Sequence, residues 1–250
     1  MKNLMRRLAS AVGYEIRRSG AFEPRLLEFL ASREIDTVLD VGANTGQFAS
    51  GLRSGGYRGR IVSFEPVSTV FEQLRRSAAG DGLWEARNLG LGAAAGTPMI
   101  HVSEDSRFSS LLRLTAAAER FDASARVVRE ETIEVRRLDD VFDEFRDRRV
   151  FLKIDTQGLE RDVLEGGADA LTRILGLQAE LPVRHFYEGV WSLPEALAYL
   201  EARGFVLAQV EPTNFDSADS VSMVELDCTF RRLTDHDRPV ATPSPVPQQG

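Results

Sequence analysis

Residues 37–48 read TVLDVGANTGQF, and this stretch decides the fold. Its first five residues are apolar and β-branched apart from one acid, Asp40, as in a strand buried on both faces of a parallel sheet. Gly42 and Gly46 bracket a tight turn, and a helix is expected from about residue 47 to 52. Glycine suits such a turn because a side chain would block the approach of the backbone to a ligand. In an open α/β sheet, this strand, turn and helix place a nucleotide-like ligand at the carboxyl end of the first strand.

The spacing of the acids and glycines narrows the class of ligand. The nicotinamide dinucleotide pattern is G-x-G-x-x-G, whereas here the pattern is G-x-x-x-G with Asn44 inside it. Asp40 lies two residues before Gly42, where a carboxylate suits a cationic amino group better than a pyrophosphate. Glu65 ends the next predicted strand, residues 60–66, and is placed to accept hydrogen bonds from ribose hydroxyls. These features predict a site for S-adenosylmethionine; the alternative is an ordinary strand–helix–strand unit without a ligand.

The composition fits one domain with a sizeable core, since 43% of the 250 residues are hydrophobic and 28% are charged. A formal net charge of -7 and a pI near 5.2 argue against a nucleic-acid backbone as the main partner. The single cysteine, Cys228, excludes an internal disulfide and a cysteine-based zinc site, and fits a reducing compartment. No apolar run reaches the roughly 20 residues of a spanning helix, and no signal-peptide core follows Met1, so we expect a cytoplasmic protein.

The two ends of the chain differ from its middle. Residues 1–20 are basic and carry apolar residues at helical spacing. One interpretation is a helix lying on the inner face of a membrane or on a glycolipid substrate; the other is a helix docked on its own domain or on the second subunit of a homodimer. We therefore divide the chain into a helical segment at 1–32, a folded domain at 33–233 and a disordered Pro-rich tail at 234–250.

The middle of the chain contains three segments with weaker signals. Residues 84–89 predict the third strand, and Asn88 near its end is a candidate to border the adenine; the alternative is a turn asparagine bonded to the backbone. Residues 105–112 change from polar to apolar, as a loop over the cofactor would. Residues 115–130 are Ala-rich and charged, and predict an exposed helix or lid.

Residues 149–160, RVFLKIDTQGLE, form the second informative stretch. They predict another buried strand that ends in Asp155 and is followed by a glycine turn and a helix. Asp155 would lie at the carboxyl edge of the sheet beside the first strand, near a bound methyl donor. Lys153 is unusual inside an apolar strand, and because a buried ammonium is costly unless paired, we expect it to meet an acid such as Asp155, Glu160 or Asp40.

The last third of the domain predicts three more strands. Residues 175–181 end near Glu180, and His185 follows at a sheet edge where substrate would enter. A neutral imidazole there can take the proton of an acceptor hydroxyl; the alternative is a surface-loop histidine. Residues 205–211 and 222–230 are predicted to form an antiparallel hairpin.

Taken together, these motifs resemble the FkbM family of S-adenosylmethionine-dependent methyltransferases. The motifs that carry the resemblance are VLDVGANTG at 38–46, FEP at 64–66, LKIDTQGLE at 152–160, SSL at 109–111 and LDD at 138–140. The resemblance covers roughly residues 33–210. It implies a class I methyltransferase (Rossmann-like) α/β fold: a three-layer sandwich with helices on both faces of a mostly parallel seven-stranded sheet, whose final strand is antiparallel.

The resemblance also implies an activity, which is O-methylation of a hydroxyl on a sugar, glycolipid or other secondary metabolite. Asp40 and Gly42 would line the methionine portion of the cofactor, Glu65 would bind the ribose, and Asp155 would lie near the transferred methyl. The predicted cofactor-binding residues are Asp40, Gly42, Asn44, Gly46, Glu65, Asn88 and Asp155. The family usually has an acid where this chain has Gln157.

The predicted reaction is an in-line displacement, in which the cofactor supplies the electrophile and the protein aligns the reacting atoms. A base beside the acceptor assists, and the candidates are His185, Asp155 and Glu180. Some related sugar O-methyltransferases use a divalent cation, and Mg²⁺ can take oxygen ligands from carboxylates such as Asp155 and Glu180. Asp139 and Asp140 precede the fourth strand and are expected to point elsewhere, so no residue is assigned as a metal ligand.

Two other functions are compatible with parts of the sequence. A nicotinamide-dependent oxidoreductase would require G-x-G-x-x-G, which is absent. A cofactor-binding subunit without catalysis, within a biosynthetic complex, is kept open by Gln157, although the acids at the strand ends argue against it. The sequence does not identify the acceptor. Its pocket would be built by the loops near 104–130 and 183–192, and the sequences of such loops do not predict which molecule they bind.

Overall fold

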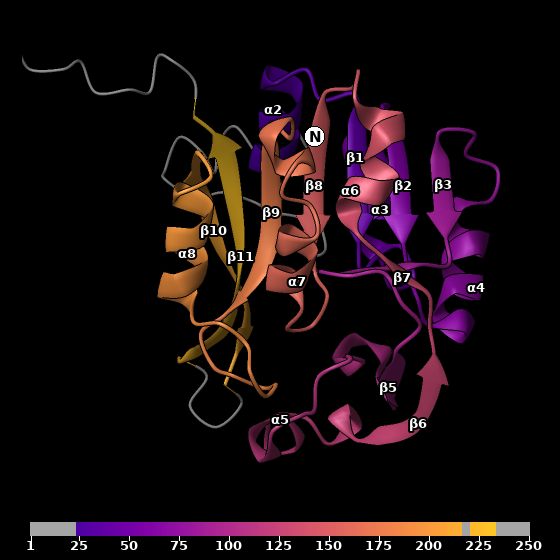
Figure 1. The fold of residues 1–250 in the computed structure, drawn as a ribbon, viewed down its shortest axis with the longest axis vertical. Helices are drawn as coiled ribbons and strands as arrows, with labels where there is room; N and C mark the ends of the chain where they lie inside the picture. Colours follow the sequence, from indigo (N-terminus) through magenta and orange to yellow (C-terminus); the bar gives the residue numbers. More distant parts are fainter. Residues whose placement is uncertain (1–23, 217–220, 234–250) are drawn as a thin grey trace, which may run out of the picture.

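A computed structural model of the chain describes residues 24–216 and 221–233 (Figure 1). The predicted basic helix at 1–20 and the predicted tail at 234–250 lie outside the described residues. The centre of the described part is a seven-stranded sheet in the order β10-β11-β9-β8-β1-β2-β3. Its strands are β1 (Thr37–Val41), β2 (Arg60–Phe64), β3 (Trp84–Arg87), β8 (Val150–Ile154), β9 (Gly176–Pro182), β10 (Phe205–Phe215) and β11 (Met223–Arg232).

The direction of the strands agrees with the fold class that the resemblance implies. All neighbouring strands from β9 to β3 are parallel, while β11 runs antiparallel to β9 and to β10. The predicted hairpin at the end of the domain is confirmed, with β10 and β11 extending beyond the expected limits. A mostly parallel seven-stranded sheet with an antiparallel final strand is therefore present, and the fold prediction is confirmed.

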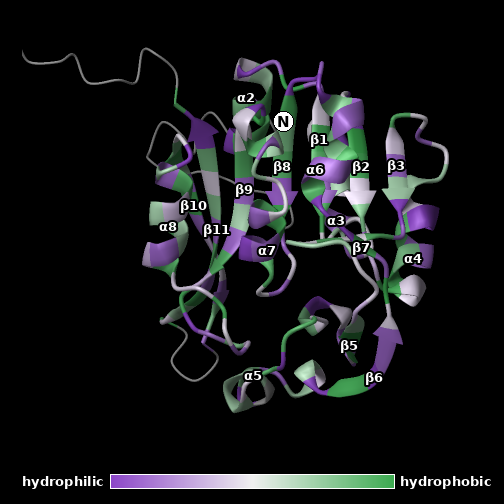
Figure 2. Ribbon diagram, in the orientation of Figure 1, coloured by the Kyte–Doolittle hydropathy of each residue, from purple (hydrophilic) through white to green (hydrophobic). Residues whose placement is uncertain are grey.

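Helices cover both faces of the sheet and make a three-layer sandwich. The helices are α2 (Pro24–Ser32), α3 (Gln47–Gly55), α4 (Ser68–Ala78), α6 (Leu138–Phe142), α7 (Glu160–Glu165) and α8 (Leu193–Glu201). In β1, Val38 packs with α2, α3 and α4, whereas the next residue, Leu39, packs with α6, α7 and α8. Because both faces are covered, β1 and β8 are buried along their whole length, which explains their unbroken apolar runs. Figure 2 shows these central strands mostly in green and the helices in mixed colours.

An insert between β3 and α6 lies beyond the carboxyl ends of the parallel strands (Figure 1). It contains β4 (Gly90–Leu91), β5 (Met99–Ser103), η1 (Ser106–Phe108), α5 (Ala116–Phe121), η2 (Ala123–Ala125), β6 (Val127–Thr132) and β7 (Val135–Arg136). The helix expected over 115–130 is wrong beyond α5. There the Asp122 side chain accepts hydrogen bonds from the backbone and hydroxyl of Ser124, which favours a turn over a helix. The β-branched residues after this turn then pair with β5 as β6.

The remaining short elements are η3 (Asp143–Phe145) and η4 (Ala170–Thr172). The start of α8 is set by a capping box, in which Ser192 and Glu195 bond to each other's backbone. Among the described residues, no helix has both the length and the apolar character needed to cross a membrane.

Candidate active site

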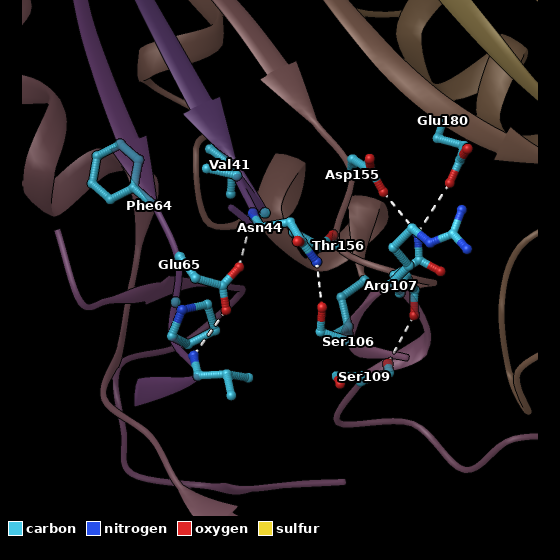
Figure 3. A pocket seen from close by; sticks show the side chains of 18 of the residues that line it. Val41, Asn44, Phe64, Glu65, Ser106, Arg107, Ser109, Asp155, Thr156 and Glu180 are labelled. Carbon is cyan, nitrogen blue, oxygen red and sulfur yellow. Dashed lines mark hydrogen bonds between the residues drawn. The ribbon is translucent and has the colours of Figure 1, made fainter. Parts of the chain in front are cut away.

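A cavity of about 620 Å³ lies at the carboxyl ends of β1, β2, β8 and β9 (Figure 3). Its walls come from the turns after these strands and from the insert, and the β10–β11 pair contributes Asn214, Glu225 and Asp227. In open α/β sheets, ligands bind in the crevice outside the carboxyl ends of the strands. The position of the cavity therefore matches the position that the sequence predicts for a cofactor.

The turn after β1 is built from three residues with positive φ: Gly42 at 76°, Asn44 at 48° and Gly46 at 91°. A Cβ on Gly42 would lie 1.8 Å from the backbone oxygen of Asp155, and a Cβ on Gly46 would lie 2.8 Å from the ring of Trp84. The glycines are thus required by backbone conformation and by contacts within the protein, and their role in the approach of a ligand stays a prediction. Gly42 lines the cavity, and Gly46 lies outside the lining.

Glu65 follows β2, lines the cavity and is only 6% exposed. Its Oε2 accepts a hydrogen bond from the backbone N–H of Asn44 at 3.0 Å, and its Oε1 accepts one from Val67 at 2.9 Å. Burial raises the pKa of Glu65 to about 7, although these two hydrogen bonds oppose the rise. Each carboxylate oxygen can accept a second hydrogen bond. Glu65 can therefore accept hydrogen bonds from ribose hydroxyls, as predicted, while it keeps its bonds to the backbone.

Asp40 does not line the cavity, in contrast to its predicted contact with the cofactor. It is fully buried; its Oδ2 accepts a hydrogen bond from Ser63 Oγ at 3.0 Å, and its Oδ1 lies 3.6 Å from Lys153 Nζ. Burial raises the pKa of Asp40 against the attraction of Lys153. In this structure Asp40 acts on the cavity through Lys153, which itself lines the cavity.

Lys153 connects the buried Asp40 to the cavity. Its Nζ donates hydrogen bonds to Asp155 Oδ2 at 3.1 Å and to the carbonyl of Gly42 at 3.4 Å. Burial acts to lower the pKa of Lys153, but the attraction of Asp155 and Asp40 outweighs it, and the pKa is raised. The predicted pairing of Lys153 with an acid is confirmed for Asp155 and Asp40, whereas Glu160 caps the following turn through backbone N–H groups.

Four carboxylates gather at one end of the cavity, and we call Asp155, Glu180, Glu225 and Asp227 the acidic end. Asp155 follows β8, Glu180 lies on β9, and Asp227 lies opposite Glu180 on β11. Burial, reinforced by Asp155, raises the pKa of Glu180 well above its usual value and that of Asp227 to about 6. Burial also raises the pKa of Glu225. The acidic end therefore favours bound protons or hydrogen-bond donors near neutral pH.

The structure brings the predicted residues Asp155 and Glu180 together, and it adds Glu225 and Asp227, which the sequence reasoning missed. A signal for the last two exists in the residues MVELDCTF of β11. There the acids occur at every second position between apolar residues, so they share one face of a strand. A charged residue inside an otherwise apolar strand is the same signal that drew attention to Lys153 in β8.

Besides Asp40 and Gly46, two further predicted site residues, Asn88 and His185, lie outside the lining. The Nδ2 of Asn88 donates hydrogen bonds to the carbonyls of Glu65 and Pro66, at 2.9 Å each, so Asn88 supports the turn that holds Glu65. His185 is exposed on the loop between β9 and α8, where its carbonyl accepts a hydrogen bond from Thr115. The candidate base is therefore corrected: the side chain of His185 is outside the cavity, while Asp155 and Glu180 line it.

A family model described as the methyltransferase FkbM domain matches residues 40–207, from β1 into β10. The chain belongs to the FkbM methyltransferase family. It is an S-adenosylmethionine-dependent methyltransferase. The match includes residues 40–48 of the first informative stretch, the whole of the second, the insert and the whole β9 strand.

Solved structures that resemble this FkbM family member share little sequence with it. A TehB-like methyltransferase from Corynebacterium glutamicum is 14% identical, with 93% of this chain and 96% of that chain covered and a TM-score of 0.43. Magnesium protoporphyrin IX methyltransferase from Synechocystis is 10% identical, with 84% and 77% covered and a TM-score of 0.46. Precorrin-6y C5,15-methyltransferase from Geobacter metallireducens is 10% identical, with 83% and 88% covered and a TM-score of 0.44. A search of the curated proteins returned no match.

The cavity of this FkbM family methyltransferase has the chemistry that S-adenosylmethionine requires. The end opposite the acids is apolar and suits an adenine; its residues are Phe64, Val67, Leu89, Leu91, Ile100, Ile133 and Val135. Glu65, Gly42 and Asp155 line the cavity, and their predicted contacts with the ribose, the methionine portion and the transferred methyl stay predictions. Residues 106–111 also line the cavity, as the loop predicted at 105–112 would, and Ser106 Oγ accepts a hydrogen bond from Asn44.

Metal-ligand geometry is absent from the described residues: none of their His, Cys, Asp and Glu side chains form a group of three or more that could hold an ion. Asp139 lies outside the lining and accepts hydrogen bonds from the backbone N–H groups of Asp169 and Ala170. It therefore points away from the cavity, as expected. The residues at the acidic end bond to amide, hydroxyl and ammonium donors instead.

Proposed function

We propose that this methyltransferase acts on a hydroxyl of a small polyhydroxylated acceptor, such as a sugar or the sugar headgroup of a glycolipid. The observation that supports this proposal is the acidic end of the cavity. Amide side chains, Gln157, Gln178 and Asn214, stand among its carboxylates and supply both donors and acceptors of hydrogen bonds. Hydroxyl groups both donate and accept, so a polyol can satisfy this lining. The concentration of carboxylates disfavours phosphate groups, and thus a nucleic-acid acceptor.

The roles of the two candidate bases follow from their partners. Asp155 Oδ2 accepts a charge-assisted hydrogen bond from the ammonium of Lys153. Glu180 accepts hydrogen bonds from the neutral groups of Gln157 and Thr213, and burial raises its pKa well above the usual value. We assign Asp155 as the base that takes the hydroxyl proton, and protonated Glu180 as a hydrogen-bond donor to the acceptor.

Bound S-adenosylmethionine supplies an activated methyl group, so the chain itself has to orient the acceptor and receive its proton. The acceptor oxygen must lie within hydrogen-bond reach of Asp155 while it faces the methionine portion beside Gly42. The insert lines the same cavity through residues 106–111, and we assign to it the exclusion of water from the acceptor. The residues to which we assign orientation of the acceptor and receipt of its proton all line the cavity.

The proposal is tested by incubating purified protein with methyl-labelled S-adenosylmethionine and a panel of acceptors. The panel should contain free sugars, glycolipids, transfer RNA and porphyrins, with products identified by mass spectrometry and by the position of the methyl ether. Transfer to a sugar or glycolipid hydroxyl is the expected result. Transfer to RNA or to a carbon or nitrogen atom of another acceptor would overturn the proposal. Cofactor binding without transfer to any acceptor would instead favour a non-catalytic subunit.

With a methylated acceptor in hand, variants test the base assignment. Asp155→Asn is expected to lower turnover about 100- to 10,000-fold, because it removes the proton acceptor. The affinity for S-adenosylhomocysteine, measured by calorimetry, should stay within about threefold, well under one factor of ten. His185→Ala is expected to keep wild-type turnover, since the side chain is exposed outside the lining. Wild-type turnover in Asp155→Asn, or a large loss in His185→Ala, would contradict the assignment.

A further inference from the structure

Gln157 occupies the turn after β8 with a left-handed backbone, φ 54°. Its carbonyl accepts a hydrogen bond from Ser110 Oγ at 2.7 Å, so the insert holds this turn from outside. On the inner side, Glu160 Oε1 accepts hydrogen bonds from the backbone N–H groups of Thr156 at 2.9 Å and Gly158 at 3.2 Å. A non-glycine residue in this conformation is held by its surroundings, which here come from two separate parts of the chain.

The side chain of Gln157 contacts two carboxyl groups of the acidic end and the hydroxyl of Tyr187. Its Nε2 donates to Asp155 Oδ1 at 2.7 Å and to Glu180 Oε2 at 3.1 Å. Figure 3 shows the side chains of Asp155 and Glu180 on the same side of the cavity, each with a dashed line that marks a hydrogen bond. The Oε1 of Gln157 accepts a hydrogen bond from the hydroxyl of Tyr187 at 2.9 Å. These contacts set the orientation of the amide, because a flipped amide would place its oxygen against two carboxylates and lose the Tyr187 bond.

Two neighbouring carboxylates repel each other unless a proton, a donor or a cation lies between them. Here the donor is the amide nitrogen of Gln157. The other oxygens are also engaged, since Asp155 Oδ2 accepts from Lys153 and Glu180 Oε1 accepts from Thr213 at 3.2 Å. A divalent cation that bridged Asp155 and Glu180 would have to displace the amide nitrogen, which cannot act as its ligand because the lone pair of an amide nitrogen is delocalised into the carbonyl.

We propose that Gln157 is the positioning residue of the acidic end and stands in place of a bridging cation. It holds Asp155 and Glu180 side by side without adding a positive charge, so the acceptor is oriented by these two carboxyl groups and not by a bound metal. A carboxylate at this position would reverse the arrangement, because oxygen ligands would replace the nitrogen that donates to Asp155 and Glu180. The inference deepens the proposed function, but its test requires neither an acceptor nor turnover.

The test is the binding of Mn²⁺ to the full chain saturated with S-adenosylhomocysteine, followed by electron paramagnetic resonance and calorimetry. Gln157→Glu is expected to bind Mn²⁺ at least about tenfold more tightly than the wild type. The matched control is Gln73→Glu, which makes the same substitution on the exposed surface of α4, where Gln73 contacts its own helix at the carbonyl of Thr69. The control should bind Mn²⁺ as the wild type does, because it adds the same charge away from the cavity.

A second variant keeps the test valid if Gln157→Glu fails to fold, which loss of S-adenosylhomocysteine binding would reveal. Tyr187→Phe removes the donor that fixes Oε1, so the amide can turn its oxygen toward a cation, and Mn²⁺ binding should tighten by about threefold or more. Wild-type protein that binds Mn²⁺ within tenfold of Gln157→Glu would overturn the inference, as would an unchanged affinity in Tyr187→Phe. Absence of hydroxyl methylation would count against the proposed function alone and leave these results unaffected.

Discussion

At the scale of single residues, the site depends on a few buried charges that share one cation. Lys153 lies between Asp40 in β1 and Asp155 after β8, and both acids are within 4 Å of its ammonium. Paired and hydrogen-bonded charges can be buried at moderate cost, whereas removal of one partner leaves the other poorly solvated. The ion pairs of Lys153 with Asp40 and Asp155 therefore affect both the stability of the sheet and the charge that faces the cavity.

Asp40→Asn should act first on stability. The substitution removes one of the two acids beside Lys153 but keeps an oxygen for Ser63, so the free energy of unfolding should fall by about 1–3 kcal/mol in urea denaturation at pH 7. Because Asp40 lies outside the lining, the affinity for S-adenosylhomocysteine should weaken by less than about tenfold. The resemblance instead implied that Asp40 contacts the methionine portion of the cofactor directly. Abolished binding with unchanged stability would restore that direct role.

Glu65 should make cofactor binding depend on pH. Burial raises its pKa to about 7, and only the ionised carboxylate can accept hydrogen bonds from both ribose hydroxyls with both oxygens. The affinity for S-adenosylhomocysteine should therefore fall by up to about tenfold as the pH drops from 8 to 6. Glu65→Gln should bind more weakly and lose this dependence. Calorimetry at the two pH values measures both effects, and an affinity that is flat or rises on acidification would refute the assignment.

At the scale of elements, the site exists because the turns after β1 and β8 touch. The two strands are paired in register from Thr37 with Val150 to Val41 with Ile154, so their turns leave the sheet at the same level. Gly42 then lies against the backbone of Asp155 with no space for a side chain. This contact sets the distance between the predicted cofactor turn and the base.

Gly42→Ala tests this contact against a matched glycine. Its Cβ would lie 1.8 Å from the Asp155 backbone oxygen, whereas Gly56, at the end of α3, has φ 104° and no atom within 4 Å of an added Cβ. Gly56→Ala should cost about 1 kcal/mol of unfolding free energy from its backbone conformation alone. Gly42→Ala should cost more than about 4 kcal/mol or prevent folding, because two backbones must separate. Equal losses in urea denaturation would show that the close approach is unimportant.

At the scale of the whole molecule, the sheet and the insert enclose a cavity that concentrates buried acids. Asp155, Glu180 and Asp227 come from three strands, and the insert covers the opposite wall. Burial raises the pKa of Glu65 and Glu160 to about 7, that of Asp227 to about 6, and that of Glu180 well above its usual value. The folded protein therefore binds more protons than the unfolded chain between about pH 4.5 and 7.

The ligand-free protein should consequently lose stability as the pH rises. A carboxyl whose folded pKa exceeds its unfolded pKa contributes stability that is present below the unfolded value and is lost as the pH passes the folded value. We expect the unfolding free energy to fall by at least about 2 kcal/mol from pH 5 to pH 8. Glu160→Gln should reduce this slope, while Glu72→Gln, on the exposed face of α4, should leave it unchanged. Stability that increases with pH over this range would contradict the prediction.

Much of the fold could be predicted from local patterns. Residues 37–48 and 149–160 combine unbroken apolar runs with glycine turns, and they became β1, β8 and the turns that line the cavity. Residues 105–112 were predicted as a loop at the cofactor, and most of this loop lines the cavity. Prediction failed where local propensity competes with pairing: the Ala-rich residues 115–130 look helical, but Asp122 ends the helix and residues 127–132 pair with β5.

The sequence by itself determined the strands, the turns and the acid at each strand end, because hydrophobic period and glycine positions act within a few residues. Only the tertiary structure decided which of those acids share the cavity. Asp40 points to Lys153 inside the sheet, His185 lies on an exposed loop, and Asp227 reaches Glu180 through an antiparallel register. These outcomes depend on pairing between strands distant in the chain and on the direction of each side chain, since a shift of one residue would move a side chain to the other face.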